Sequence, residues 1–342
     1  IESIPDPVQI HYHLPNELSL RVHREFEEYL NELSLLFPKE RDAIRSFYNE
    51  CWTVFNSLNA MPLYSLEEPR YLLSVFLQNP IGCLQLLRYF PQNVGDVVNK
   101  YISDPILKKY IDLDCFLWSV VNAEKTPMIN AGMVFCDRHF GGIRYPKGGV
   151  GQISERLVDG LKSYEGCSIQ YKSRVKRILY DSETNQAFGV ELTNGNTLYA
   201  KTIVSNATRW DTFDKLMDDS YVLPESEQKW RDRYMKSPSF LSLHLAVDES
   251  VFDSSIKHQD DCHHIILEDW DQMEACNDAN GTIFMSIPTV LDPSLAPKGK
   301  HIFHVFTPSD IEEWNELNTK EYEQQKIDFT NKLLLRIEQS KV

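Results

Sequence analysis

The amino-acid sequence predicts a mixed α/β fold of the α+β kind, with helices first, an α/β segment in the middle and a mixed sheet last. Three observations lead to this prediction. Apolar residues recur at helical spacing from about residue 16 to about residue 125. From about Phe140 the chain changes to glycine-rich turns and short strand-like segments, and four more strand candidates follow residue 236. Two domains, each built from separate stretches of the chain, would explain this order.

The composition limits the class of protein. The chain has 342 residues, of which 42% are hydrophobic and 25% charged, as in folded globular proteins. Its formal net charge of −15 repels nucleic-acid phosphates, so no nucleic-acid partner is expected. Seven widely spaced cysteines without a CxxC motif fit a reducing compartment better than a disulfide framework or a zinc site. The sequence contains no run of 18 apolar residues, so no transmembrane helix is expected.

The first part of the chain predicts a series of helices. Leu18, Val22 and Phe26 begin an apolar pattern at intervals of three and four that predicts a helix from Glu17 to Phe37, ended by Pro38. Further helices are expected at Lys39–Asn59, Val94–Lys109 and Leu113–Ala123.

The stretch from Tyr71 to Leu87 contains no charged residue, and Asn79-Pro80 interrupts it. It predicts two short helices, because proline breaks a helix. The stretch is too short to span a bilayer, so it is either a buried helix pair or an element lying in the membrane interface. In the second case the aromatic residues at headgroup depth would be Tyr71, Phe76, Tyr89 and Phe90.

The middle of the chain predicts a glycine turn, a helix and three strands. Residues 141–151 contain five glycines, and Ile153, Leu157 and Leu161 then share one face of a helix. The strand segments expected next are residues 168–180, 187–193 and 196–206. Asn194-Gly195, between the last two, predicts a type I′ hairpin turn, because that turn needs positive φ at both central residues.

The last part predicts an acidic helical link from Asp211 to about Lys236, four strands and a helix. The strand candidates are residues 240–247, 262–268, 282–288 and 300–308. A helical pattern from Lys320 reaches Val342 without a stop signal. The chain begins with Ile1 rather than Met, so both ends are expected to lack sequence.

Few residue clusters suggest chemistry by themselves. The glycine turn comes close to a GxGxxG motif but does not match it, and it serves either as a plain turn or as a site of close ligand approach. Asp137, Arg138 and His139 precede it and form either a salt-bridged loop or an acid, base and anion-binding group.

The histidines and serines give weaker signals. His11 and His13 would share one face of a strand, whereas His263 and His264 would point to opposite faces. No carboxylate or cysteine lies at a convincing ligand spacing, so no metal is expected. The serines show no pairing with a histidine and no GxSxG motif occurs, so hydrolase chemistry has no support.

Several segments together resemble a known family. They include HYHLPNELSLRVHREFEEYL, CDRHFGGIRYPKGGVGQI, SNATRWDTF and IPTVLDPSLAPKGKHIFHVFTP, and the resemblance covers essentially the whole chain. These segments are similar to those of plant and cyanobacterial carotenoid isomerases, the prolycopene isomerases. That family belongs to the phytoene desaturase-like branch of the flavin amine oxidase superfamily.

The resemblance implies a partial FAD-binding Rossmann-type domain interleaved with a mixed-sheet substrate domain and a helical cap. Residues 1–139 would form part of the substrate domain with its cap and a possible membrane contact. Residues 140–210 would be the central part of the FAD domain, and residues 211–342 the sheet and C-terminal helix of the substrate domain.

The resemblance also implies site residues. The strand with Val175 would meet the adenine of FAD, and the strand ending at Asn206 and Ala207 would return toward the flavin. The turn with Gly148 and Gly149 would lie where the flavin and substrate cavities meet. Tyr145 and Pro146 in the same turn would contact the substrate.

The sequence departs from the family at both ends. The family's N-terminal GxGxxG motif and its C-terminal flavin segment do not occur, so the chain is expected to be a fragment that is inactive alone. The intact protein would use reduced FAD to convert cis double bonds of prolycopene to trans without net oxidation. Asp137, Arg138 or His139 would supply a proton or stabilise charge.

Two alternative functions remain open. One is an FAD-dependent carotenoid desaturase, and the other is a carotenoid- or membrane-binding protein that has lost its flavin. The resemblance implies a carotenoid substrate, and it favours a peripheral membrane contact because carotenoids dissolve in bilayers. It also implies a location in a plastid, or in a photosynthetic membrane of a cyanobacterium.

Overall fold

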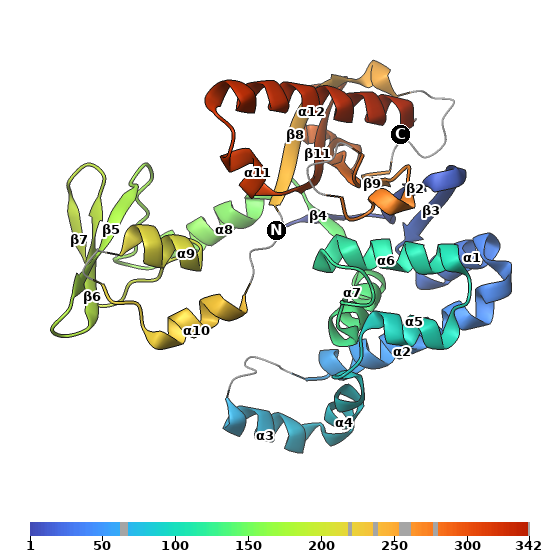
Figure 1. The fold of residues 1–342 in the computed structure, drawn as a ribbon, viewed down its shortest axis with the longest axis horizontal. Coiled ribbons are helices and arrows are strands. Elements are labelled where there is room, and N and C mark those ends of the chain that lie inside the picture. The colour runs from blue at the N-terminus through green and yellow to red at the C-terminus, as the bar shows by residue number, and fades with distance from the viewer. Residues whose placement is uncertain (62–67, 218–220, 235–238, 253–260, 276–279, 341–342) are drawn as a thin grey trace. The chain divides into compact units, whose positions relative to one another are not determined.

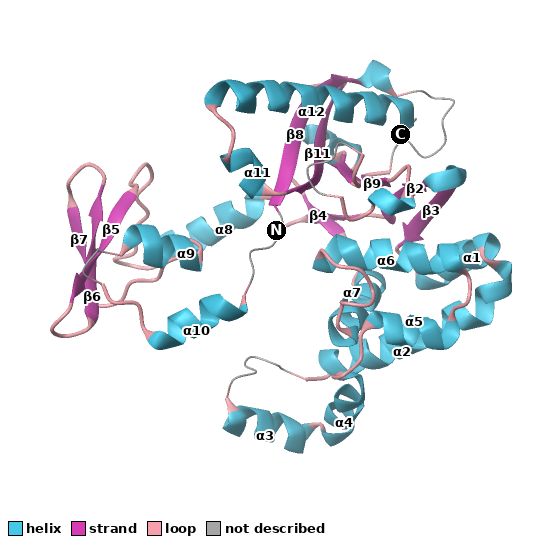
Figure 2. Ribbon diagram, in the orientation of Figure 1, coloured by secondary structure: helices cyan, strands magenta, loops and turns pink. Residues whose placement is uncertain are grey.

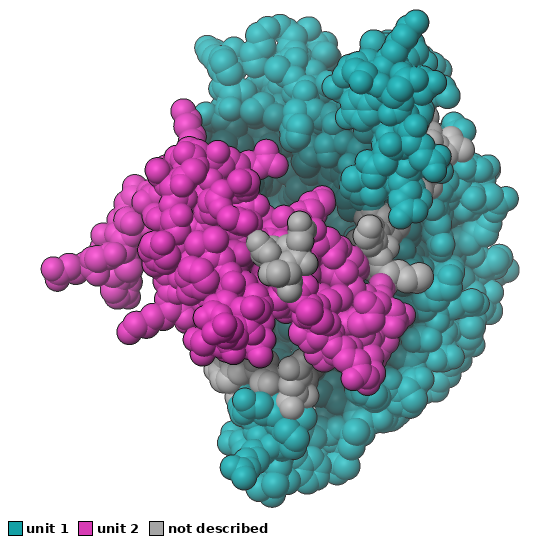
Figure 3. All heavy atoms as spheres, turned by 60° about the vertical axis from the view of Figure 1, so that its left-hand side comes forward, with its two compact units in different colours: residues 1–153, 238–342 teal, residues 154–237 magenta. Residues whose placement is uncertain are grey.

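The structure is a computed structural model that describes residues 1–61, 68–217, 221–234, 239–252, 261–275 and 280–340 (Figure 1). The chain divides into two compact units (Figure 3). The larger unit comprises residues 1–153 and 238–342, and the smaller unit comprises residues 154–237. The larger unit is therefore built from two separate stretches of the chain.

A six-stranded sheet forms the centre of the larger unit (Figure 2). In spatial order its strands are β3 (Leu18–His23), β2 (Val8–Leu14), β9 (His263–Ile266), β10 (Ile283–Ser286), β11 (Lys300–Ser309) and β8 (Ser239–Asp248). Strands β2 and β9 run parallel, whereas the other neighbouring pairs are antiparallel. The expected mixed sheet is confirmed. A separate two-stranded ribbon joins β1 (Ser3–Pro5) to β4 (Arg144–Pro146).

Helices account for most of the rest of the larger unit. Before the second unit these are α1 (Phe26–Leu36), α2 (Arg41–Asn59), α3 (Pro69–Gln78), α4 (Pro80–Tyr89), α5 (Val94–Tyr101), α6 (Pro105–Ser119) and α7 (Met128–Phe140). After the sheet come α11 (Ile311–Asn315) and α12 (Thr319–Ser340). The uncharged stretch does form the expected helix pair, α3 and α4, with Pro80 at the first position of α4.

The sheet separates two hydrophobic cores, because side chains alternate between its faces. On one face Tyr12, Ile265 and Phe284 pack with the buried residues of α1, α2 and α5 to α7. On the other face, Ile283 and Val305 pack against α12. Burial of these apolar surfaces is the main force that holds the helices to the sheet.

The prediction of a helix from Glu17 to Phe37 is wrong for its first part. Residues 18–23 form β3, which pairs with β2, and α1 begins only at Phe26. Leu18, Leu20 and Val22 alternate with polar residues, which is the period of a strand. Leu18 and Val22 also fit a helical interval, so the two periods overlap over these few residues.

The two helices expected at 94–109 and 113–123 are divided at a different point. α5 ends at Tyr101, and a single helix, α6, runs from Pro105 to Ser119. The Asp104 side chain accepts hydrogen bonds from the N–H groups of Ile106 and Leu107, at 2.8 and 3.0 Å. Asp104 and Pro105 are therefore a helix start signal, which the apolar pattern alone did not reveal.

The smaller unit contains a three-stranded antiparallel sheet with short helices. Its strands are β5 (Val175–Asp181), β6 (Gln186–Leu192) and β7 (Thr197–Tyr199). Its helices are α9 (Arg209–Asp211) and α10 (Glu225–Arg233). Helix α9 continues as a π-helical turn (Thr212–Leu216). Helix α8 (Gly151–Lys162) begins in the larger unit and continues into the smaller one.

The hairpin between β6 and β7 is confirmed, but its turn is not type I′. Among the described residues only Gly195, and not Asn194, has positive φ in this turn. The Gly195 N–H donates to the Leu192 carbonyl, and the Leu192 N–H donates to the Asn196 carbonyl. This is a three-residue loop in which glycine alone takes the left-handed conformation.

The remaining sequence expectations concern cysteines and membrane spans. The six cysteines within the described residues are free thiols, and Cys276 lies outside those residues. None of the helices that the structure describes is long and apolar enough to cross a bilayer.

Candidate functional site

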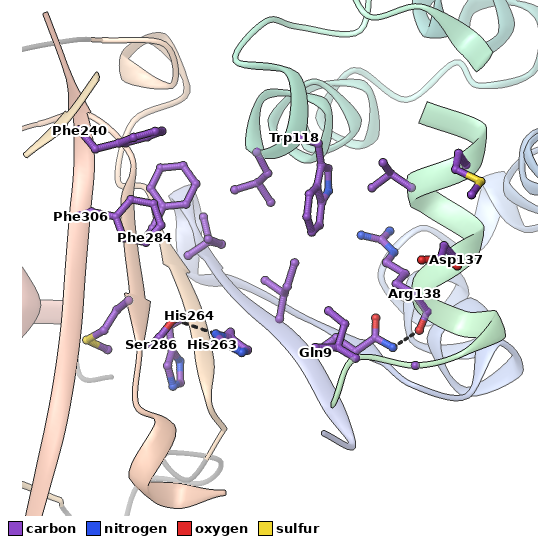
Figure 4. Close-up of a pocket in the computed structure, with 18 residues that line it drawn as sticks. Gln9, Trp118, Asp137, Arg138, Phe240, His263, His264, Phe284, Ser286 and Phe306 are labelled. Atoms are coloured by element: carbon purple, nitrogen blue, oxygen red, sulfur yellow. Dashed lines mark hydrogen bonds between the residues drawn. The ribbon is translucent and has the colours of Figure 1, made fainter. Parts of the chain in front are cut away.

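A cavity of about 610 Å³ lies in the larger unit between the sheet and helices α6 and α7 (Figure 4). Most of its lining is apolar. Trp118 of α6 points into it from the helical side, and Phe284 and Phe306 face it from the sheet. An apolar cavity with a few polar groups is typical of a site for a small hydrophobic molecule.

An aromatic row forms the sheet wall of the cavity. Phe284 and Phe306 are opposite each other on β10 and β11, and their rings stack with centroids 4.8 Å apart. Phe240 of β8 meets the Phe306 ring edge-on at 5.3 Å. Ile265 lies opposite Phe284 on β9 and extends the row. These side chains hold one another in fixed orientations.

Arg138 of α7 reaches the cavity as half of a buried ion pair. Its guanidinium donates two hydrogen bonds to the Asp114 carboxylate, at 3.0 and 2.8 Å. Tyr12 donates a third to Asp114 at 2.8 Å. Burial opposes the charge on Arg138, yet the nearby Asp114 carboxylate raises the pKa of the guanidinium well above its usual value. Arg138 therefore provides a permanent positive charge.

Asp137 and His139, the neighbours of Arg138, lie in different surroundings. Asp137 is exposed and lines the cavity. His139 is not among the lining residues, and its ring stacks on Tyr29 at 5.2 Å. Burial, together with the Arg138 charge, lowers the pKa of His139 to about 3, so this imidazole is neutral.

A polar row crosses the sheet next to the aromatic row. His263, Ser286, His304 and His244 occupy successive paired positions on β9, β10, β11 and β8. Nδ1 of His263 lies 2.8 Å from Oγ of Ser286, and both residues line the cavity. The sequence did not reveal this pairing of a histidine with a serine, because the two residues are 23 positions apart.

The opposite face of the sheet carries a second histidine cluster. His11 and His13 do share a face, and His264 joins them because it pairs with His11 across β2 and β9. Nε2 of His13 lies 3.1 Å from Nδ1 of His264, whose Nε2 lies 2.7 Å from the Asp261 carbonyl. The three rings lie close enough to share a cation. These hydrogen bonds already satisfy the His264 nitrogens, so we assign no metal here.

The glycine turn lies beside β4 in the larger unit. Gly148 and Gly149 have φ values of 84° and 93°, which side chains other than glycine rarely adopt. The Gly148 N–H donates to Asp292 at 2.7 Å, so one amide of the turn is already bonded within the protein. Tyr145 and Pro146 form β4 with Arg144, and partial burial raises the pKa of the Tyr145 hydroxyl.

The other residues expected to bind the cofactor belong to the smaller unit. Val175 begins β5. The strand expected to end at Asn206 and Ala207 is wrong in its second part, because β7 ends at Tyr199, and these two residues lie in the irregular segment just before α9. The structure brings Tyr145, Pro146, Gly148 and Gly149 together in one unit. It groups Val175, Asn206 and Ala207 in the other.

Solved structures identify the fold. An oxidoreductase from Methanosarcina mazei is similar to 97% of this chain over 66% of its own length, with a TM-score of 0.58 and 15% identity. A RAB GDI from Plasmodium falciparum is similar to 92% of this chain over 63% of its own, with a TM-score of 0.51 and 13% identity. One fold serves both proteins, so the fold alone assigns no activity.

The mixed sheet and helical cover therefore define the class as a two-unit protein of mixed helices and sheets with the fold shared by these two structures. Residues 100–334 match the family described as flavin containing amine oxidoreductase. The chain belongs to this family, and membership implies a flavin cofactor.

Curated relatives agree with the resemblance found in the sequence motifs. Prolycopene isomerase from Arabidopsis thaliana is 51% identical over 339 residues, which are 99% of this chain and 55% of the relative. Prolycopene isomerase 1 from an Oncidium hybrid cultivar is also 51% identical, over 99% of this chain and 56% of the relative. All-trans-retinol 13,14-reductase from Danio rerio is 24% identical over 90% of this chain and 54% of the relative. The chain spans about half the length of these relatives.

Proposed function

We propose that the intact protein is a carotenoid cis–trans isomerase that converts the cis double bonds of prolycopene to trans without net oxidation. The observation that carries this proposal is the 51% identity to prolycopene isomerases over 339 residues. The apolar cavity supports it, because a long hydrocarbon substrate needs a binding site lined by apolar side chains.

The cofactor of the intact protein is proposed to be FAD in its reduced form. When bound, reduced flavin would supply electron density that lowers the order of a cis double bond. Two glycines with positive φ fit the close approach of a cofactor to the backbone of the turn. Gly148 and Gly149 are the proposed contacts there, and Val175, Asn206 and Ala207 are the proposed contacts in the smaller unit.

The cavity would act mainly by orienting the polyene and excluding water. The stacked Phe284 and Phe306 rings provide a flat wall for a conjugated chain. Tyr145 and Pro146 are the proposed substrate contacts in the turn. Asp137 and Arg138 would contribute charge beside the polyene. His139 is a neutral imidazole outside the cavity lining, so it is the weakest of the three proposed residues for this role. Isomerisation that is unchanged when Asp137 is replaced by Asn in the intact protein would remove Asp137 from this role.

Product mass separates the proposed functions. Isomerisation of prolycopene by the intact flavin-loaded protein leaves the mass unchanged, whereas desaturation removes two hydrogens. A product lighter by two hydrogens would establish the desaturase instead. Absence of a flavin absorption band in the purified intact protein would favour the carotenoid- or membrane-binding alternative.

A peripheral membrane contact is proposed for helices α3 and α4. Their exposed residues include Leu73, Leu77, Ile81, Leu84 and Leu87, with Leu77 and Ile81 each 71% exposed. Tyr89, expected at headgroup depth, is instead buried in the protein. Such a patch of large apolar side chains on adjacent helices is typical of a surface that another phase or molecule covers. A bilayer is the proposed occupant, because the stretch is uncharged and carotenoids dissolve in lipid.

Vesicle flotation of the intact protein tests this contact. Replacing both Leu77 and Ile81 by Asp is expected to reduce the floated fraction at least about tenfold, because charged groups do not enter the bilayer interior. Leu35→Asp is the matched control, since Leu35 is an exposed leucine on α1, outside the helix pair. Equal flotation of the double variant and the wild type would contradict the proposal.

The proposed location is a plastid, with association to a membrane there. The relatives from Arabidopsis thaliana and Oncidium are both named chloroplastic, which supports the plastid. Fractionation of plastids with an antibody to the intact protein tests the membrane part of the proposal.

A further inference from the structure

The polar row beside the aromatic wall ends at a buried acid. Asp6 lies in the loop between β1 and β2, and its side chain is almost fully buried. Its N–H donates to the carbonyl of Ile143, a cavity-lining residue, at 3.0 Å. One carboxylate oxygen of Asp6 accepts from the Val8 N–H at 3.2 Å. The other, Oδ2, is buried and has no hydrogen-bond partner among the described residues.

The free oxygen of Asp6 faces His263. The distance from Asp6 Oδ2 to His263 Nε2 is 3.8 Å, which is slightly longer than a hydrogen bond. On its other side the imidazole contacts Ser286 Oγ through Nδ1, at 2.8 Å. Catalytic hydrogen bonds are often long in free enzymes and tighten when substrate binds. The three side chains thus form a line from the protein interior to the cavity.

The protonation states of Asp6 and His263 leave one proton that can move along the three side chains. Burial raises the pKa of Asp6 to about 7, and the Asp261 carboxylate adds to the increase. Burial lowers the pKa of His263 below its usual value. Asp6 is therefore an acid that still holds its proton near neutral pH, and His263 is a neutral imidazole that can pass a proton on.

Further titratable groups surround this line. Burial raises the pKa of the neighbouring Cys262 thiol to about 12, so it keeps its proton. His304 lies opposite Ser286 on β11, and burial lowers its pKa. Across the cavity, α7 presents Asp137 and Arg138. Arg138 is already paired with Asp114.

We propose that Asp6, His263 and Ser286 form a proton relay that opens into the cavity and serves the isomerisation proposed above. Ser286 is its catalytic residue, because Ser286 lines the cavity and carries the hydroxyl at the end of the line. Asp6 is the proton source, and His263 carries the proton between them. The inference rests on the proposed isomerase function.

The relay step balances in atoms and electrons. Ser286 Oγ gives its proton to one carbon of the cis double bond, whose π electrons form the new C–H bond. Ser286 regains a proton from Nδ1 of His263, and Nε2 of His263 regains one from Asp6, which becomes a carboxylate. The positive charge spreads along the conjugated chain, and the former double bond rotates. The reverse sequence then removes a proton and restores the double bond in trans.

The test compares the intact flavin-loaded wild type with Asp6→Asn and Ser286→Ala. Each variant is expected to isomerise prolycopene at least about 100-fold more slowly at about pH 6, the range for loss of a general acid. The wild-type rate should fall as pH rises above about 7, and D6N should lose this dependence. Ser286→Thr keeps a hydroxyl and should restore most of the rate. Asp112→Asn is the matched control, because Asp112 is a partly buried acid of raised pKa outside the cavity lining.

Infrared difference spectra of wild type against D6N provide a readout without turnover. They are expected to show an Asp6 carboxylic acid that titrates near pH 7. A carboxyl that titrates near the ordinary value of about 3.9 overturns the relay whatever the activity. An active wild type with an equally active D6N also overturns it and leaves the isomerase standing. If the intact wild type does not isomerise prolycopene, the proposed isomerase function is wrong. The relay then has no role in isomerisation, even if Asp6 titrates near pH 7.

Discussion

The ion pair between Asp114 and Arg138 is the most buried charged contact among the described residues, with both side chains no more than 3% exposed. It survives burial because both charges are hydrogen-bonded. Asp114 accepts hydrogen bonds from Arg138 and Tyr12. Nearby, the Tyr29 hydroxyl oxygen lies 2.7 Å from that of Tyr48 and 2.8 Å from that of Tyr110. The network fixes α6 and α7 relative to β2.

Replacing Asp114 by Asn should destabilise the protein strongly, because it leaves the Arg138 charge buried without its counter-ion. The expected loss in the free energy of unfolding is about 3–5 kcal/mol. Urea denaturation followed by circular dichroism measures it. Asp159→Asn removes an exposed partner of Arg156 and should leave the unfolding free energy unchanged. Equal stability of D114N and wild type would contradict this account.

Asp6 should make stability depend on pH in a direction that is unusual for a carboxyl group. Its pKa is about 7 in the folded state and 3.8 in the unfolded reference, so the folded protein holds the proton more tightly. The contribution is fully present below pH 3.8 and is lost as pH rises through 7. Compared with Asp6→Asn, the wild type should lose up to about 4 kcal/mol between about pH 4 and about pH 8. Urea denaturation at several pH values measures this, and parallel pH curves for the two proteins would disprove it.

The sequence could suggest only those site residues that are neighbours along the chain. Asp137 and Arg138 are adjacent, so their charges form a group that is visible in the sequence itself. Asp6, His263 and Ser286 gave no such signal, because the strands β9 and β10 and the β1–β2 loop bring them together over long distances in the chain. Sequence spacing alone could not indicate which residues are opposite each other across paired strands.

At the scale of elements, α2 and α7 pack unusually closely at Gly132. A Cβ atom added to Gly132 would lie 2.7 Å from Cβ of Val54 on α2, which is shorter than real contacts. Glycine is normally poor in a helix, so its presence here reflects the space available between the two helices.

Gly132→Ala should therefore destabilise the protein by about 1–3 kcal/mol, even though alanine favours helix formation. Adding Val54→Ala should recover part of that loss, so the double variant should lose less than the sum of the single variants. Gly160→Ala is the control, because Gly160 lies in α8 with no atom near its added Cβ. It should gain about 0.5–1 kcal/mol. Thermal or urea unfolding of all these variants measures the differences.

The sequence predicted elements whose period is clear, and it failed where two periods overlap. The helix at 41–59 and the four late strands follow from sustained periodicity. The sequence pattern misassigned β3 because Leu18 and Val22 fit both periods, and only its pairing with β2 decides between them. The Asn194-Gly195 dipeptide correctly predicted the position of the hairpin. It did not predict the loop length, which follows from the pairing of Leu192 with Asn196.

At the scale of the whole molecule, the negative charge and the proposed membrane contact act against each other. A net charge of −15 repels anionic lipid headgroups, whereas the helix pair α3 and α4 has few charges. Attraction to lipid would therefore come from apolar burial rather than from charge.

These 342 residues should accordingly bind vesicles of neutral lipid more strongly than vesicles with anionic lipid at low salt. High salt should remove the difference, because it screens charges beyond a few ångströms. Co-sedimentation with vesicles of phosphatidylcholine, with and without phosphatidylglycerol, measures both effects. Stronger binding to the anionic vesicles would contradict the account.

The parallel pairing of β2 with β9 has a consequence for how the protein is made. His13 and His264 meet across this pair although 251 positions separate them. A ribosome therefore releases β2 and β3 long before their sheet partner β9 exists. During that interval the β2 edge and the helices around it expose apolar surface, and such surface aggregates readily. Newly made chains of this protein should therefore depend on chaperones until synthesis has passed β9.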